Sequence, residues 1–480
     1  MSTSLELNST ALPPERKGGM AGFWSDLREA LAGSRQDFTE GSIGRAIMLL
    51  AIPMVLEMSL ESLFAICDVF FVSRLGSDAV ATIGLTESMI TIIYAIGIGL
   101  SMATAATVAR RIGEKNPKAA AETAVQAIGL SITASLPIGL VGILFAPKLL
   151  RLMGASDGII HTGSRFTAIM LGANVVIMLL FIINGVFRGA GDAAISMRVL
   201  WLANFINIVL DPCFIFGLGP FPRLGVTGAS VATTIGRGTG VLFQIFTLLR
   251  AKGRIKVTRA ELKLNPKIML RLLRISLGGI FQFLISTASW VGMVRIISSF
   301  GAAAVAGYTI AIRIIFFSIL PSWGLSNAAA TMVGQNLGAR KPDRAERSVW
   351  VTGFCNMVFL ASVGVFFIFF AEPVVHLFSR ERDVVPYAVT CLRYISYGYI
   401  AWGYGMVMVQ AFNGAGDTGT PTAVNFFCYW LFQIPLAYTL AFPAKMGANG
   451  VFLAIPISGV LVAGVSMVLF RRGRWKRQRV

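Results

Sequence analysis

Long apolar runs separated by short polar segments dominate the chain. A transmembrane helix needs about 20 mostly apolar residues, and twelve runs reach that length. Glycine and proline recur inside them, which transmembrane helices tolerate better than helices of soluble proteins. The pattern predicts twelve membrane spans, at residues 45–73, 80–109, 118–146, 162–187, 193–217, 225–249, 272–299, 303–334, 346–371, 386–412, 419–442 and 448–470.

The composition agrees with an all-α polytopic membrane protein. Of the 480 residues, 55% are hydrophobic and 14% are charged, whereas about a quarter of the residues in an average soluble domain are charged. So few charges cannot cover a soluble surface. The five cysteines lie inside apolar runs without the spacing of a disulfide framework or a zinc site. We expect no resident cofactor.

The net charge of +19 reflects orientation in the membrane. Basic residues concentrate in alternate connecting segments, which places these segments and both termini in the cytoplasm by the positive-inside rule. This placement predicts a multi-pass protein of the bacterial inner membrane, with the lipid bilayer as its partner and no role for nucleic acid. The predicted inner positions are 16–45, 110–118, 188, 250–274, 340–347 and 471–479.

The chain contains an internal repeat. Residues 99–122 align without gaps on 324–347, and nine of these 24 pairs are identical. The sequence Phe-Arg-Gly-Ala-Gly-Asp at 187–192 matches Phe-Asn-Gly-Ala-Gly-Asp at 412–417 at the same offset of 225. An even number of spans in each copy predicts two parallel six-helix lobes, related by a pseudo-twofold axis along the membrane normal, with a cleft between them.

This repeat divides the chain into five parts. We expect a cytoplasmic tail at 1–42, an N-lobe at 43–249, a cytoplasmic linker at 250–271, a C-lobe at 272–470 and a basic tail at 471–480. The first tail is open to two interpretations, a disordered segment or a short amphipathic helix capped by Ser25.

Two lobes around a cleft suit a carrier that works by alternating access. The chain has no G-x-x-x-x-G-K-[ST] motif and no soluble stretch long enough for a nucleotide-binding domain, so we expect an ion gradient to drive transport. It also has no convergent nucleophile–base or metal-binding set, which argues against an enzyme.

Five acidic residues lie inside the predicted spans and away from the first turns of these spans, where a carboxylate is costly and marks a functional position. Glu57, Glu61 and Asp68 fall on one face of the first span, within about 40° at 100° per residue. A stripe of carboxylates must face protein or water and suits the uptake and release of protons, although a structural network with buried arginines is the alternative. The other two acids are Glu87 and Asp211.

In the fifth span, Asn207 and Asp211 lie one turn apart, before Pro212. An amide oxygen and a carboxylate at this spacing can ligate a hard cation such as Na⁺. By itself this pair is a weak signal.

Taken together, these motifs resemble the multidrug and toxin extrusion (MATE) family over residues 43–470. The resemblance rests on the two six-span repeats, on Cys67-Asp68-Val69-Phe70 with Pro53 before it, on the repeated Gly-Ala-Gly-Asp and on 207–212. The Asn-x-x-x-Asp pair looks most like the DinF-like branch.

The resemblance implies an antiporter that exchanges H⁺ or Na⁺ for amphiphilic, cationic drugs or toxins. It also implies that Pro53 is the hinge of the first span. The cation-coupling residues that it implies are Asp68, Asn207, Asp211, Thr233 and Asn184. All of these except Asn184 are candidate ligands of Na⁺.

Some positions depart from the family pattern. Phe64 stands where an aromatic hydroxyl is expected, and spans seven and ten carry Gln282 and Gln410 instead of carboxylates. Coupling should therefore reside in the N-lobe. The residues that we expect to contact substrate are Glu57, Glu61, Phe64, Glu87 and Gln282.

The main alternative is a flippase for a lipid-linked or polysaccharide precursor, from the wider superfamily that shares this architecture. Such anionic substrates would prefer a cavity rich in arginine and lysine. The acidic stripe argues against this alternative, whereas three arginines at membrane depth, Arg237, Arg295 and Arg313, keep it open. We expect a monomer that transports small organic cations without an obligate protein partner.

Overall fold

The computed structural model describes residues 20–34, 36–250 and 253–478, and within these ranges it leaves the side chains of residues 20, 21, 65–69, 73, 259 and 260 undescribed. The described chain consists of helices joined by short turns. These are α1 (Met20–Ala32), α2 (Ile43–Ser73), α3 (Ser77–Gly113), α4 (Pro117–Leu152), α5 (Asp157–Gly172), α6 (Asn174–Ala190), α7 (Ala193–Phe216), α8 (Val226–Leu249), α9 (Pro266–Ile297), α10 (Ala302–Gly338), α11 (Pro342–His376), α12 (Val385–Tyr397), α13 (Tyr399–Ala415), α14 (Gly419–Asn425), a π-helical segment η3 (Phe426–Gln433), α15 (Ile434–Ala441) and α16 (Ala448–Arg471), besides three short 3-10 turns.

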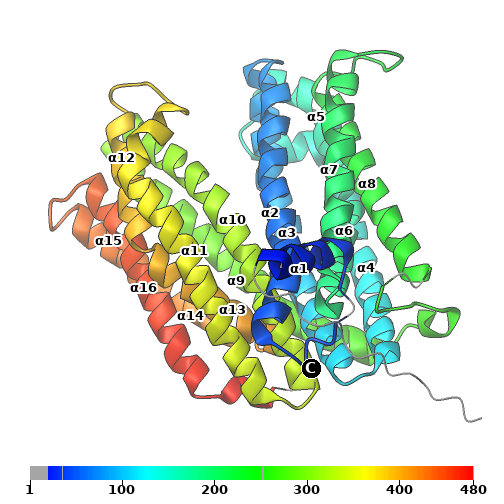
Figure 1. The fold of residues 1–480 in the computed structure, drawn as a ribbon. Coiled ribbons are helices and arrows are strands. Elements are labelled where there is room, and N and C mark those ends of the chain that lie inside the picture. The colour runs from blue at the N-terminus through cyan, green and yellow to red at the C-terminus, as the bar shows by residue number, and fades with distance from the viewer. Residues whose placement is uncertain (1–19, 35, 251–252, 479–480) are drawn as a thin grey trace, which may run out of the picture.

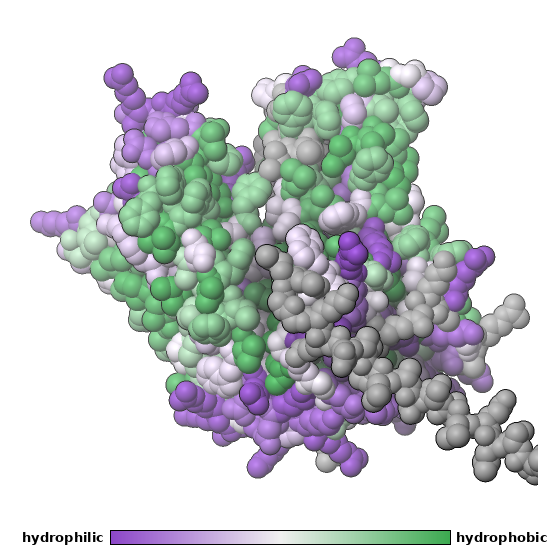
Figure 2. All heavy atoms as spheres, in the orientation of Figure 1, coloured by the Kyte–Doolittle hydropathy of each residue, from purple (hydrophilic) through white to green (hydrophobic). Residues whose placement is uncertain are grey.

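The predicted all-α polytopic fold is confirmed. Ten described segments are long and apolar enough to cross a membrane. The other two predicted spans correspond to α8 and to α12 with α13, which are not among these ten segments. On the face that Figure 2 shows, apolar residues dominate the middle of the molecule, and hydrophilic residues gather above and below them.

The two halves repeat each other in detail. The fourth span breaks after Gly172 and the tenth breaks at Gly398, so each consists of two helices. The helices after these breaks end at Gly191 and Gly416, which have left-handed φ angles of 86° and 84°. Sequence periodicity did not predict the two breaks, because the apolar run continues through both.

The lobes separate at one end of the molecule and meet at the other (Figure 1). At the closed end, the repeat-related Gly113 of α3 and Gly338 of α10 lie against each other. A Cβ atom added to Gly113 would lie 1.9 Å from the Gln335 carbonyl oxygen, and one added to Gly338 would lie 2.2 Å from that of Arg110. Only glycine therefore permits this close crossing of two backbones.

Basic side chains gather at the closed end, where they hold a segment that we call the strap, residues 36–41. Arg254 of the linker donates to the Gln36 carbonyl oxygen at 2.6 Å. Lys341 and Arg344, from the C-lobe, donate to the carbonyl oxygens of residues 39 and 40 at 3.0 and 2.8 Å. Phe38 is fully buried beneath Arg254. The strap therefore contacts both the linker and the C-lobe.

The strap follows α1, which occupies part of the predicted N-terminal tail. Ser25 lies inside this helix, since α1 begins at Met20, and so it is not the N-cap. Arg45 of α2 anchors α1 through ion pairs with Asp26 at 2.9 Å and Glu29 at 2.6 Å.

Candidate functional site

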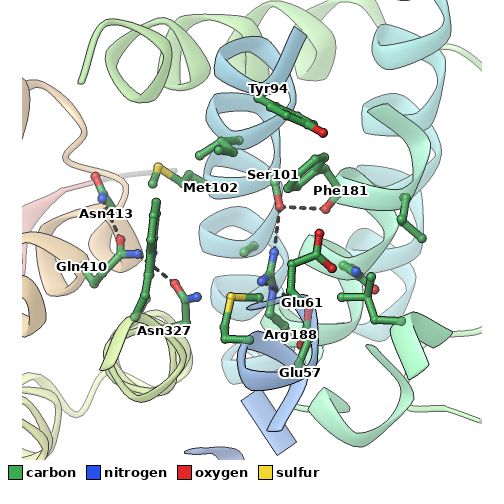
Figure 3. A pocket seen from close by; sticks show the side chains of 18 of the residues that line it. Glu57, Glu61, Tyr94, Ser101, Met102, Phe181, Arg188, Asn327, Gln410 and Asn413 are labelled. Carbon is green, nitrogen blue, oxygen red and sulfur yellow. Dashed lines mark hydrogen bonds and ion pairs between the residues drawn. The ribbon is translucent and has the colours of Figure 1, made fainter. Parts of the chain in front are cut away.

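A cavity of about 310 Å³ lies between the lobes, near the point where they meet. Five N-lobe helices (α2, α3, α6, α7 and α8) and three C-lobe helices (α9, α10 and α13) contribute to its wall. The wall is mostly apolar and aromatic, with Tyr94, Phe181 and Trp323 among its larger members. Polar groups are few and differ between the two lobes, as Figure 3 shows.

The N-lobe side of the cavity is charged. Glu57 of α2 is buried, with 1% of its surface exposed, and its Oε1 lies 3.7 Å from Nη1 of Arg188 on α6. Arg188 also donates to the Ser101 hydroxyl of α3 at 3.2 Å. One turn from Glu57, Glu61 accepts a hydrogen bond from Asn204 of α7 at 3.3 Å. Arg237 of α8 also lines the cavity, so two carboxylates and two guanidiniums share this wall.

A second polar cluster lies behind this wall, between α7 and α8. Asp211 is completely buried, and one of its oxygens lies 2.7 Å from the side-chain nitrogen of Asn207. The Asn207 oxygen accepts from both the backbone N–H and the hydroxyl of Thr233, each at 2.9 Å. Because Asn204, Asn207 and Asp211 share one face of α7, this helix connects Glu61 with the buried cluster.

The C-lobe side of the cavity is neutral and built from amides. Gln410 of α13 donates to the Asn327 side-chain oxygen of α10 at 2.8 Å. Asn413, one turn along α13, donates to the Gln410 oxygen at 2.8 Å and to the Gln282 oxygen of α9 at 3.2 Å. These amides tie together three helices of the C-lobe.

The structure brings together several of the predicted coupling residues. Asn207, Asp211 and Thr233 form one cluster, and Asn184 lines the cavity, where its oxygen accepts from Gln244 at 2.7 Å. Asp68 lies in α2, but its side chain is outside the described part of the structure.

The predicted substrate-contacting residues fall in different places. Glu57 and Glu61 line the cavity, and Gln282 lies behind it in the amide cluster. Phe64 is buried away from the cavity, and Glu87 is exposed on α3. Pro53 lies within α2, which continues through it.

Sequence reasoning did not place Arg188 in the cavity. Its charge was attributed to an inner segment, yet it belongs to α6 and pairs with Glu57. One signal was available, because the repeat places Asn413 at the corresponding position. A position that changes from arginine to asparagine between copies is a candidate for a specialised role.

The comparisons with known proteins agree with this architecture. The MatE family model matches the chain twice, at residues 53–213 and 279–439, once in each lobe. The chain is 24% identical to the probable multidrug resistance protein YoeA of Bacillus subtilis, across 93% of this chain and 97% of that protein. It is also 24% identical to the probable multidrug resistance protein NorM of Thermotoga maritima, across 91% and 94% of the two chains.

Solved structures show the same fold. A crystal structure of MATE in complex with MaL6 superimposes with a TM-score of 0.86 and 26% identity, across 92% of this chain and 99% of that chain. A MOP superfamily transporter from Pyrococcus furiosus gives a TM-score of 0.85 at 26% identity, across 92% and 98%. The cavity between two repeated lobes, the family model and these relatives lead to one conclusion: the chain belongs to the MatE family of multidrug efflux transporters and is a membrane carrier, not an enzyme.

Proposed function

We propose that the chain is a secondary active antiporter that exports amphiphilic organic cations in exchange for H⁺ or Na⁺ across the bacterial inner membrane, with both termini in the cytoplasm. The observation that carries the proposal is the set of buried N-lobe carboxylates. Glu57 and Asp211 are both almost completely buried. A membrane protein retains such costly groups where they bind ions or protons.

The connection between the cavity and the buried cluster supports coupling between substrate and ion. Glu61 faces the cavity and bonds Asn204, while Asn207 and Asp211 follow on the same face of α7. A cation bound at Asp211 therefore competes, through one helix, with a cation in the cavity. When binding of the ion and binding of the substrate oppose each other in this way, transport of one is coupled to transport of the other.

The cavity lining combines two carboxylates with two arginines, Arg188 and Arg237, and so lacks the excess of basic residues that anionic flippase substrates would prefer. Glu57 and Glu61 both line the cavity, and Arg188 is engaged with Glu57 and Ser101. Of the three arginines that kept the alternative open, Arg237 lines the cavity, whereas Arg295 and Arg313 are exposed away from it. The named relatives described above are multidrug resistance proteins. The flippase is therefore not favoured.

The test is ethidium export from energised cells, with the proton and sodium gradients collapsed separately. We expect the wild-type chain to export the dye, Asp211→Asn and Asp68→Asn to lose gradient-driven export, and one of the two treatments to identify the coupling ion. Asp157→Asn is the matched control, because this carboxylate is 97% exposed at the start of α5. Absence of dye export under every gradient, or full export by Asp211→Asn, would contradict the proposal.

A further inference from the structure

The strap is held by both lobes at the end where they meet. On the C-lobe side, Lys341 and Arg344 at the start of α11 donate to the carbonyl oxygens of residues 39, 40 and 41 at 3.0, 2.8 and 2.9 Å. On the other side, Arg254 donates to the carbonyl oxygens of residue 34, just before the strap, and of residue 36 at 3.0 and 2.6 Å. Arg254 is itself fixed to the N-lobe, because its backbone N–H donates to Asp192, just before α7, at 2.6 Å. The strap therefore bridges two bodies that an alternating-access carrier must separate.

Phe38, in the middle of the strap, fills the seam between the lobes. It is fully buried, and Cζ of Arg254 lies 4.6 Å from its ring centre. A Cβ atom added to Gly191, at the end of α6, would lie 2.6 Å from the Phe38 ring and 3.2 Å from Nε2 of Gln335 on α10. The ring and the amide thus lie against the same glycine, and Gln335 also donates to the Gly189 carbonyl oxygen at 3.0 Å. Parting of the lobes would separate Gly191 from Gln335 and expose the ring.

Both ends of the strap are attached to helices of the N-lobe. Before the strap, α1 is bound to α2 by the two ion pairs of Arg45, and Arg198 of α7 donates to the Leu31 carbonyl oxygen at 2.5 Å. After the strap, the chain enters α2 at Ile43. When the lobes part, the contacts of the strap that must break are therefore those with the C-lobe.

We propose that the strap is a latch for the closed end of the carrier. Its hydrogen bonds with α11 form only while the lobes meet at this end, so they favour the state in which the opposite end is open. Their release shifts the carrier toward the state that is open at the strap. The inference goes beyond the proposed antiport function, because it depends on the two-lobed carrier and not on the identity of the ion or the substrate.

Spin-label distances in the purified full-length chain, after replacement of the native cysteines, test the latch. Labels at Leu152 and Leu377, which are 83% and 82% exposed at the opposite end, report how far apart the lobes are there. The test variant combines Lys341→Met with Arg344→Met, which keeps the aliphatic stems and removes the donors. The matched control combines Arg340→Met with Arg347→Met, which removes two charges from exposed positions in the same segment.

We expect the Lys341→Met and Arg344→Met pair to raise the ratio of short to long label distances about tenfold, equivalent to about 1.4 kcal/mol. The control pair should keep the ratio of the wild type. A second variant carries one glycine inserted after Gly41, which displaces the strap carbonyl groups without removing a charge. It should shift the ratio in the same direction. Thermal melting of each variant confirms that it is folded.

The outcomes separate the latch from other roles of the basic residues. A control-like distance distribution in the folded Lys341→Met and Arg344→Met variant would overturn the latch. A shift that the glycine insertion does not reproduce would also overturn it, because the basic residues would then act on a group other than the strap. The distances need neither an ion gradient nor a dye. Absence of ethidium export by the wild type, with the distance shift intact, would therefore overturn the antiport proposal alone.

Discussion

The crossing of α3 and α10 at the closed end should control which face of the carrier is open. The perturbation is Gly113→Ala or Gly338→Ala. The new methyl group of Gly113→Ala would lie 1.9 Å from the Gln335 carbonyl oxygen, so the backbones must separate by about 1.5 Å to reach ordinary contact. Overpacking of this size costs about 1–3 kcal/mol, or about a 5- to 150-fold shift away from the closed state.

Distances between spin labels at the opposite end report this shift. Leu152 at the end of α4 and Leu377 just after α11 are repeat-related, and they are 83% and 82% exposed. With alternating access, opening of the basic end should close this end, so both variants should enrich the shorter label distances. Ethidium export should fall in parallel, because the carrier spends less time open to the outside.

The control is Gly84→Ala, on the same helix α3, because an added Cβ there meets no atom within 4 Å. The reasoning is refuted if folded Gly113→Ala and Gly338→Ala give the same distance distribution as this control. The double variant should cost less than the sum of the single ones, since one separation of the helices relieves both clashes.

Three further predictions concern charge and burial. Arg188→Leu leaves the carboxylate of Glu57 buried without its partner, so thermal unfolding should show a loss of about 3–5 kcal/mol, and adding Glu57→Gln should recover much of it. Phe38→Ala should cost about 3–5 kcal/mol and loosen the strap, which proteolysis after residue 35 would detect as faster cleavage. Burial alone would raise the pKa of Asp37, but hydrogen bonds from Thr39 and nearby basic charges lower it. The ionised carboxylate therefore stabilises the strap at pH values above its ordinary pKa, and this stabilisation is lost as the pH falls below about 4. Protection of the strap from proteolytic cleavage should therefore be constant between about pH 5 and 8.

Most of the fold follows from patterns that depend on local sequence. Apolar runs located the twelve spans, and the repeat predicted two equivalent lobes, because both signals are written along the chain. The helix breaks at Ala173 and Gly398 were not predicted, because hydropathy does not indicate where a helix changes direction. The predicted span at 225–249 corresponds to α8, whose Arg237 lines the cavity.

The site was harder to predict because its geometry depends on contacts between distant segments. The stripe of Glu57 and Glu61 was visible on one helix, and both residues line the cavity. Arg188 was assigned to an inner segment by the positive-inside rule, which counts charges near span ends without knowing their partners. Glu87 was predicted to contact substrate because it lies inside a predicted span, yet its side chain is exposed and does not line the cavity.

The contacts of the strap constrain the length of this segment more than its amino-acid sequence. Arg254, Lys341 and Arg344 bind backbone carbonyl oxygens in the strap, and every amino acid supplies the same carbonyl group. These contacts therefore depend on the number of residues between the carbonyl groups and not on most of the strap's side chains. One inserted or deleted residue moves each following carbonyl by about 3.3–3.6 Å, farther than a hydrogen bond tolerates. The length of the strap is therefore constrained more tightly than most of its side chains, and the buried Phe38 fixes the position of the strap along the chain.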